Sequence, residues 1–92
     1  MTKEEEIMSF LQMSIFDPIL KSTKASEKLK SATRGAILRF KQRNAQKMIE
    51  YFWSEVVGTP DRSTKYGRLM KGEGFTQFEQ IADEFRVRMK DI

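Results

Sequence analysis

The chain has 92 residues, of which 39% are hydrophobic and 33% charged, and its net charge is +4. A chain of this length forms one domain, residues 1–92, and its composition is typical of a soluble globular protein rather than a disordered one. Cysteine and histidine are both absent, which excludes a disulfide framework, thiolate and imidazole metal ligands, and the commonest general base near neutral pH.

Sequence motifs for catalysis are also missing. No Gly-rich phosphate loop of the GxxxxGK[ST] type occurs, and no pair of carboxylates stands out as a general acid and base. We therefore predict a protein that is not an enzyme and that needs no metal and no cofactor. The lack of cysteine fits a reducing compartment, and the predicted location is the cytoplasm.

The N-terminal segment predicts a helix from about residue 3 to 16. Thr2 and Glu5 have the spacing of a capping box, in which each side chain binds a free N–H of the first turn. Asp17-Pro18 predicts the end of this helix, because the residue before a proline is disfavoured in the α-conformation, and Asp17 is a candidate cap for a new turn with Pro18 in its first position. The apolar run is about half as long as a membrane-spanning helix, so no transmembrane segment is expected. The apolar stripe consists of Ile7, Phe10, Leu11, Ser14 and Ile15, widened by Met8 and Met13.

Residues 25–57 carry two apolar stripes. The first consists of Ala25, Leu29, Ala32, Ala36, Ile37 and Phe40, and the second of Ala45, Met48, Ile49, Phe52, Trp53 and Val56. At about 100° per residue, the two stripes are centred on nearly opposite sides of a helix. Either the helix that Ser26 caps breaks near residues 42–44, with Asn44 capping a new one, or a single long helix is covered on opposite sides by different neighbours. The break is the preferred interpretation.

Glycine and proline divide the C-terminal third of the chain. Gly58 and Pro60 predict the end of a helix, and residues 61–74 predict a loop with two helical turns around residues 63–70. A last helix is expected after a second capping box, formed by Thr76 and Glu79. No segment shows β-alternation. The predicted fold class is therefore all-α, a small single-domain bundle or orthogonal array of four to five helices.

Positive charge is concentrated in residues 21–47. This segment holds nine basic residues and one acid, Glu27, whereas the rest of the chain holds eight basic residues and twelve acids. Such a field favours a polyanionic partner. A solvated helix face usually mixes both signs of charge, so the near absence of acids favours a nucleic-acid-binding surface. Its candidate residues are Lys21, Lys24, Lys28, Lys30, Arg34, Arg39, Lys41, Arg43 and Lys47.

On a helix drawn over residues 24–43, most of these basic side chains lie opposite or beside the apolar stripe. There they can reach several phosphates of duplex DNA or of a folded RNA. A second, weaker basic cluster consists of Arg62, Lys65, Arg68 and Lys71, with Tyr66 among them. It suits either a clamp on a phosphate backbone or an ordinary exposed connection, and the second interpretation is preferred.

Three consecutive aromatic residues, Tyr51-Phe52-Trp53, form the densest apolar feature. On a helix they span about 200° of its circumference, more than one neighbouring helix covers. Phe52 and Trp53 are predicted to lie in the core. The alternative is a protein interface at Tyr51 or Trp53, including one that joins a homodimer. Base stacking on these rings is disfavoured, because the charged residues nearby in the sequence are Glu50 and Glu55.

These observations lead to one functional hypothesis and two alternatives. The leading hypothesis is a small non-enzymatic regulator or accessory subunit that binds DNA or RNA mainly through phosphates. The first alternative is a protein-interaction module or inhibitor that docks on an acidic or nucleic-acid-binding surface of a larger partner. The second is attachment to an anionic membrane surface through a basic amphipathic helix, which is weaker because the bulky aromatic residues lie downstream of the basic segment.

Overall fold

Residues 3–20 form one long helix. The computed structural model describes residues 2–58, 63–75 and 77–90, and for residues 78 and 79 it describes the backbone only. Three segments follow one another without a break: α1 (Lys3–Leu11), the π-helical η1 (Gln12–Phe16) and α2 (Asp17–Leu20). The predicted capping box is confirmed, since Glu5 N–H donates to Thr2 Oγ1 at 3.1 Å and Thr2 N–H donates to Glu5 Oε1 at 3.0 Å.

The predicted end of this helix at Asp17-Pro18 is wrong. In an α-helix a proline ring collides with the carbonyl four residues earlier, and proline has no N–H to donate. Here Asp17 N–H donates to the carbonyl of Gln12, five residues back, so the turn just before Pro18 is wider than an α-turn. The wider turn lets the helix continue to Leu20, and Phe16 and Ile19 are thereby buried in the core.

The predicted break after the second helix is confirmed. Helix α3 (Glu27–Lys41) ends before a short bend, and α4 (Ala45–Tyr51) begins after it and continues into the π-helical η2 (Phe52–Val57). Asn44 caps α4, because its Oδ1 accepts from Lys47 N–H at 3.0 Å. Glu4 of α1 accepts from Ala45 N–H at 2.8 Å. The bend is therefore fixed both by its own cap and by the start of the first helix.

Two shorter helices complete the described chain. Helix α5 (Lys65–Gly72) corresponds to the helical turns predicted around residues 63–70, and α6 (Phe78–Arg88) to the predicted last helix. Thr64 joins α5 to η2: its Oγ1 accepts from Gly67 N–H at 2.8 Å and donates to the Val56 carbonyl at 3.0 Å. A Cβ on Gly67 would lie 2.7 Å from that Thr64 oxygen, so this close approach requires glycine. Pro60 and the predicted capping box at 76 and 79 lie outside the described residues and side chains.

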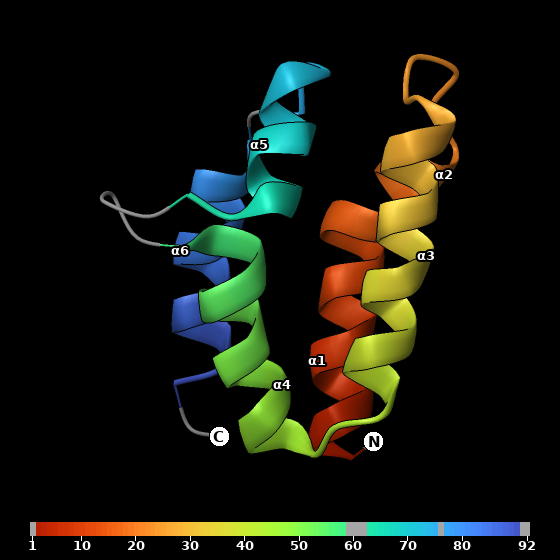
Figure 1. The fold of residues 1–92 in the computed structure, drawn as a ribbon. Helices are drawn as coiled ribbons and strands as arrows, with labels where there is room; N and C mark the ends of the chain where they lie inside the picture. The colour runs from red at the N-terminus through yellow and green to blue at the C-terminus, as the bar shows by residue number, and fades with distance from the viewer. Residues whose placement is uncertain (1, 59–62, 76, 91–92) are drawn as a thin grey trace.

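The helices pack as an all-α domain, and the described residues contain no strand. Figure 1 shows the first helix beside α3, running in opposite directions, with η2, which continues α4, and α6 as a second pair, and α5 near one end. The radius of gyration is 12.5 Å, as expected for a compact domain of this length, about 12 Å. Four phenylalanines with no exposed surface lie in the core, namely Phe16, Phe40, Phe52 and Phe85. The rings of Phe52 and Phe85 stack at 4.0 Å and join η2 to α6.

Candidate nucleic-acid interface

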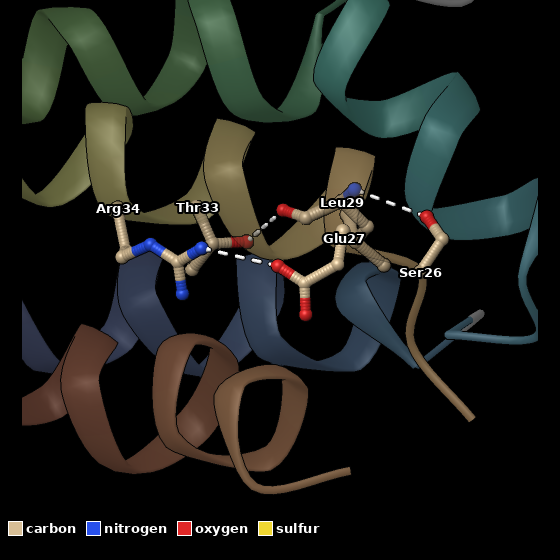
Figure 2. Close-up of polar contacts among 5 residues, drawn as sticks. All are labelled: Ser26, Glu27, Leu29, Thr33 and Arg34. Carbon is tan, nitrogen blue, oxygen red and sulfur yellow. Dashed lines mark hydrogen bonds and ion pairs between the residues drawn. The ribbon is translucent and has the colours of Figure 1, made fainter. Parts of the chain in front are cut away.

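Helix α3, which carries most of the basic segment, is fixed at its N-terminus by two hydrogen-bonded contacts. Ser26 Oγ caps it by accepting from Leu29 N–H at 3.1 Å (Figure 2). Glu73, just after α5, accepts from both the N–H and the hydroxyl of Ser26, each at 2.6 Å. The bond from the Ser26 side chain is the main cause that lowers the pKa of the Glu73 carboxyl, and the charge of Lys28 adds to it. The start of α3 is therefore tied to the end of α5.

The predicted nucleic-acid-binding residues do not all lie on one helix. The expected helix over residues 24–43 begins later, because Lys24 precedes the Ser26 cap. Lys21 and Lys24 lie in the connection before α3, Lys28, Lys30, Arg34, Arg39 and Lys41 lie on α3, Arg43 lies in the bend, and Lys47 lies on α4. At about 100° per residue, the five on α3 divide between the two edges of its exposed face.

One edge of α3 carries Lys30, Arg34 and Lys41, which we call the outer row. These residues are four and seven positions apart, a spacing that keeps them on one side of the helix. Arg34 Nη2 lies 3.5 Å from Glu27 Oε2 (Figure 2), and the two side chains are 56% and 85% exposed. An ion pair this exposed contributes little, so Arg34 stays available to a stronger anionic partner. Leu38, which is 61% exposed, lies between the outer row and the opposite edge.

The opposite edge of α3 faces a groove with a volume of about 680 Å³. Lys28 and Arg39 line the groove from α3, and Lys65, Tyr66 and Leu69 line it from α5. Among the lining residues four are basic, with Arg43 as the fourth, and Glu55 is the one acid. The groove therefore has a positive balance of charge.

Tyr66 connects the two walls of this groove. Its hydroxyl lies 2.7 Å from the hydroxyl of Thr33, which is fully buried on α3 and also donates to the Leu29 carbonyl at 2.9 Å. Figure 2 shows the Thr33 side chain turned toward Leu29 along the helix. Burial raises the pKa of Tyr66 to about 12, although the hydrogen bond with Thr33 acts against that rise. The phenol is therefore neutral throughout the physiological pH range.

Arg43 and Lys47 already make contacts within the chain. Arg43 Nη1 donates to the carbonyl of Arg39, and its guanidinium lies over the Tyr51 ring, 4.3 Å from the centroid. A cation at this place satisfies a free carbonyl at the end of α3. Lys47 Nζ lies 3.3 Å from Glu50 Oε2 on an exposed surface. Arg43 therefore has a structural role in the bend in addition to any contact with a partner.

The aromatic triplet is only partly in the core. Phe52 is fully buried, as predicted, whereas Tyr51 and Trp53 are half-buried. Tyr51 packs edge-on against Phe40 with centroids 4.9 Å apart, and Trp53 packs edge-on against Phe52 at 5.2 Å. Glu50 and Glu55 lie near the triplet in the sequence, but Arg43 and Arg86 approach the Tyr51 and Trp53 rings from other parts of the chain. A protein interface at Tyr51 and Trp53 stays a prediction.

Whether the second basic cluster is a phosphate clamp or an ordinary exposed connection stays a prediction. The structure brings Lys65 and Tyr66, which are not among the nine predicted binding residues, to the same groove as Lys28 and Arg39. The signal for this was Thr64, whose side chain begins a helix at Lys65 and so fixes which residues point toward α3. Arg68 instead lies 3.5 Å from the Ser63 hydroxyl, and Arg62 lies outside the described residues.

Neither a metal site, a membrane-spanning helix nor a known relative points to a particular class of protein. The described residues contain no group of three or more acidic side chains placed to hold a metal ion. Within the same part of the chain, no helix has both the length and the apolar character needed to cross a membrane. The chain matches no protein-family model, no curated protein and no solved structure.

Proposed function

We propose that this protein binds nucleic acid, DNA or RNA, mainly through phosphates, and that it acts without catalysis as a cytoplasmic regulator or accessory subunit. The observation that carries the proposal is the exposed face of α3. It presents basic residues along both edges, and the one acid of the whole 21–47 segment, Glu27, is engaged by a single exposed ion pair. A field of one sign on a rigid helix is the electrostatic footprint of a polyanion-binding surface.

The spacing of the outer row supports contacts to several phosphates. Lys30 and Lys41 are eleven residues apart on one helix, which corresponds to roughly 16 Å along its axis. One strand of duplex carries about five phosphates over that length. The outer row therefore has the length to contact consecutive phosphates without reading their sequence.

Salt dependence of binding tests the proposal. We expect the purified protein to retard duplex DNA, single-stranded DNA or RNA in a gel-shift titration. Because each neutralised phosphate releases condensed counterions, about four contacts should weaken binding by roughly a hundredfold between about 50 and 200 mM salt. A loss of only a few-fold over that range, or no binding at about 50 mM, contradicts the proposal.

A matched pair of variants tests which surface is used. Lys30→Gln with Lys41→Gln removes two charges from the outer row, and Lys3→Gln with Lys90→Gln removes two from exposed positions on α1 and after α6. We expect the first pair to weaken binding to duplex DNA by about tenfold or more and to flatten the salt slope by about two units. The second pair should change affinity by much less. Equal losses from both pairs would show that only net charge matters.

One observation favours a second candidate function, a module that docks on an acidic face of a larger protein. Leu38 is 61% exposed and lies between the two basic edges of α3. An apolar centre surrounded by charged residues is the arrangement of a protein interface. This candidate predicts no binding to nucleic acid by the isolated chain, and it predicts that Leu38→Ser weakens the complex with the protein partner.

A further inference from the structure

The groove between α3 and α5 has a size that selects among nucleic acids. Its volume is about 680 Å³, within the range of sites that enclose small ligands, about 300–1,000 Å³. The α3 side of the groove is lined by the small residues Ser31, Ala32 and Gly35. A duplex is too wide to enter a hollow of this size, whereas an unpaired nucleotide and its neighbouring phosphates fit.

Positive charge is placed at both ends and on both walls of this groove. Lys28 and Arg39 lie eleven residues apart on α3, and Lys65 faces them from the start of α5. No hydrogen bond or ion pair engages the side chains of Arg39 or Lys65 within the part of the chain that the structure describes. Arg43, by contrast, is held against the Arg39 carbonyl and the Tyr51 ring. Arg39 and Lys65 are therefore the cations best placed to receive a phosphate.

The α5 wall adds an apolar surface beside these cations. Tyr66 and Leu69 line the groove, and the Tyr66 hydroxyl is engaged with Thr33 at 2.7 Å. That hydrogen bond fixes the ring, and a neutral, fixed aromatic ring next to cations is the arrangement on which unpaired bases stack. Glu55 is the one acid among the described lining residues, so the groove keeps its positive balance.

We infer that this groove binds a single-stranded segment of nucleic acid, with phosphates on Lys28, Arg39 and Lys65 and an unpaired base against Tyr66. The inference rests on the proposed function and makes it more specific, because it separates two surfaces of α3. The outer row contacts phosphates of any nucleic acid, and the groove accepts only a strand whose bases are not paired. Single strands are therefore bound more tightly than a duplex of the same length.

Gly35 gives a direct test without disturbing the core. A Cβ at this position would meet only Arg39 Nη1, at 3.6 Å, which is ordinary contact. Gly35→Glu places a carboxylate in the groove, and Gly35→Gln adds the same bulk without charge. Both replacements raise the helix propensity of α3, so loss of folding is not expected, and circular dichroism with a thermal melt checks this.

The measurement is fluorescence anisotropy with a labelled oligothymidylate and with a labelled duplex of the same length. We expect Gly35→Glu to weaken single-strand binding by at least about tenfold relative to Gly35→Gln, because a like charge beside the bound phosphate is strongly unfavourable. Duplex binding should change by less than about threefold, since the duplex uses the outer row.

Three results would overturn the inference in distinguishable ways. If both Gly35 variants bind oligothymidylate as the wild type does, the groove is not used, while the proposed function stands on the outer row. If both variants lose affinity equally with the fold intact, no phosphate lies beside Gly35. If the wild type binds neither oligonucleotide at about 50 mM salt, the proposed function fails together with the inference.

Discussion

A buried threonine controls the contact between α3 and α5. Thr33 has no exposed surface, and its hydroxyl bonds both the Leu29 carbonyl and the Tyr66 hydroxyl. A buried hydroxyl without partners would destabilise the fold, so Thr33 and Tyr66 depend on each other. The apolar pattern that predicted Leu29, Ala36 and Phe40 in the core did not include this residue, because a polar position on the buried side of a helix needs a partner that lies elsewhere in the chain.

Removing the Tyr66 hydroxyl should lower stability and change the response to alkaline pH. Tyr66→Phe keeps the ring but removes one hydrogen bond, which costs about 1 kcal/mol, or roughly 4–8 °C in Tm for a chain of this size. In the wild type the folded pKa of about 12 exceeds the ordinary value of 10.0. Between these two pH values the folded state keeps the Tyr66 proton, whereas the unfolded state loses it. The contribution of this proton to folding stability is therefore fully present below about pH 10 and is lost as pH rises toward 12.

The measurement is urea denaturation at neutral pH and at several alkaline pH values, together with the tyrosinate absorbance of the folded protein. Tyr66→Phe should abolish the absorbance step near pH 12 and should lose less stability than the wild type above pH 10. An unchanged absorbance titration in the variant would show that Tyr66 does not titrate there. Ser63→Ala, at an exposed position near the start of α5, serves as the control and should leave both measurements as in the wild type.

At the scale of helices, local sequence signals predicted where a helix begins more accurately than where it ends. The caps at Thr2, Ser26 and Asn44 all form the expected hydrogen bonds, because a cap depends on residues within one turn of each other. The end at Pro18 was wrong, because Asp17 adopts the α-conformation before Pro18 and the π-turn relieves the collision of the proline ring with the carbonyl four residues earlier. Continuing the helix past Pro18 also buries apolar surface, because it places Ile19 in the core.

Gly58 ends the helix formed by α4 and η2, and its backbone explains why glycine is needed. Its φ and ψ are 74° and −164°, a region that only glycine occupies readily, and its N–H donates to the Trp53 carbonyl at 2.9 Å. Gly58→Ala should therefore cost about 1–3 kcal/mol in the free energy of unfolding.

Gly72→Ala is the matched control, because Gly72 is the last residue of α5 and a Cβ there meets nothing within 4 Å. We expect this control to be neutral or slightly stabilising. Both variants are compared by urea denaturation followed by circular dichroism. A Gly58→Ala variant as stable as Gly72→Ala would show that the helix end does not depend on this backbone conformation.

At the scale of the whole molecule, the sequence predicted the all-α class and the location of the positive charge, but not what each edge of the basic helix faces. Periodicity places Lys28 and Lys30 on different edges of α3, and packing against α5 makes the edge with Lys28 one wall of a groove. The groove itself was not predictable, because it depends on how α5 approaches α3. That approach is set by contacts over long sequence distances, such as Ser26 with Glu73 and Thr33 with Tyr66.

The concentrated charge should also make folding stability depend on salt. Residues 21–47 hold nine basic residues against one acid, and folding brings Lys65 beside the same groove as Lys28 and Arg39. Like charges repel within about a Debye length, which falls from roughly 10 Å at 0.1 M to about 3 Å at 1 M salt. Raising the NaCl concentration over this range should therefore stabilise the folded state, by about 0.5 kcal/mol or roughly 2–4 °C in Tm.

Thermal melts of the wild type and of a Lys65→Gln variant test this explanation. Because Lys65 lies across the groove from the α3 cations, removing its charge should raise Tm at low salt and reduce the further rise on adding NaCl. Lys3→Gln, at an exposed position in the first turn of α1, removes one charge that does not line the groove and should leave the salt response unchanged. If Tm falls with NaCl in the wild type, or if Lys65→Gln and Lys3→Gln behave alike, repulsion across the groove does not limit stability. A groove that is destabilised by its own charge should in turn be stabilised by an anionic strand, so the same melts with oligothymidylate added should show the largest rise in the wild type at low salt.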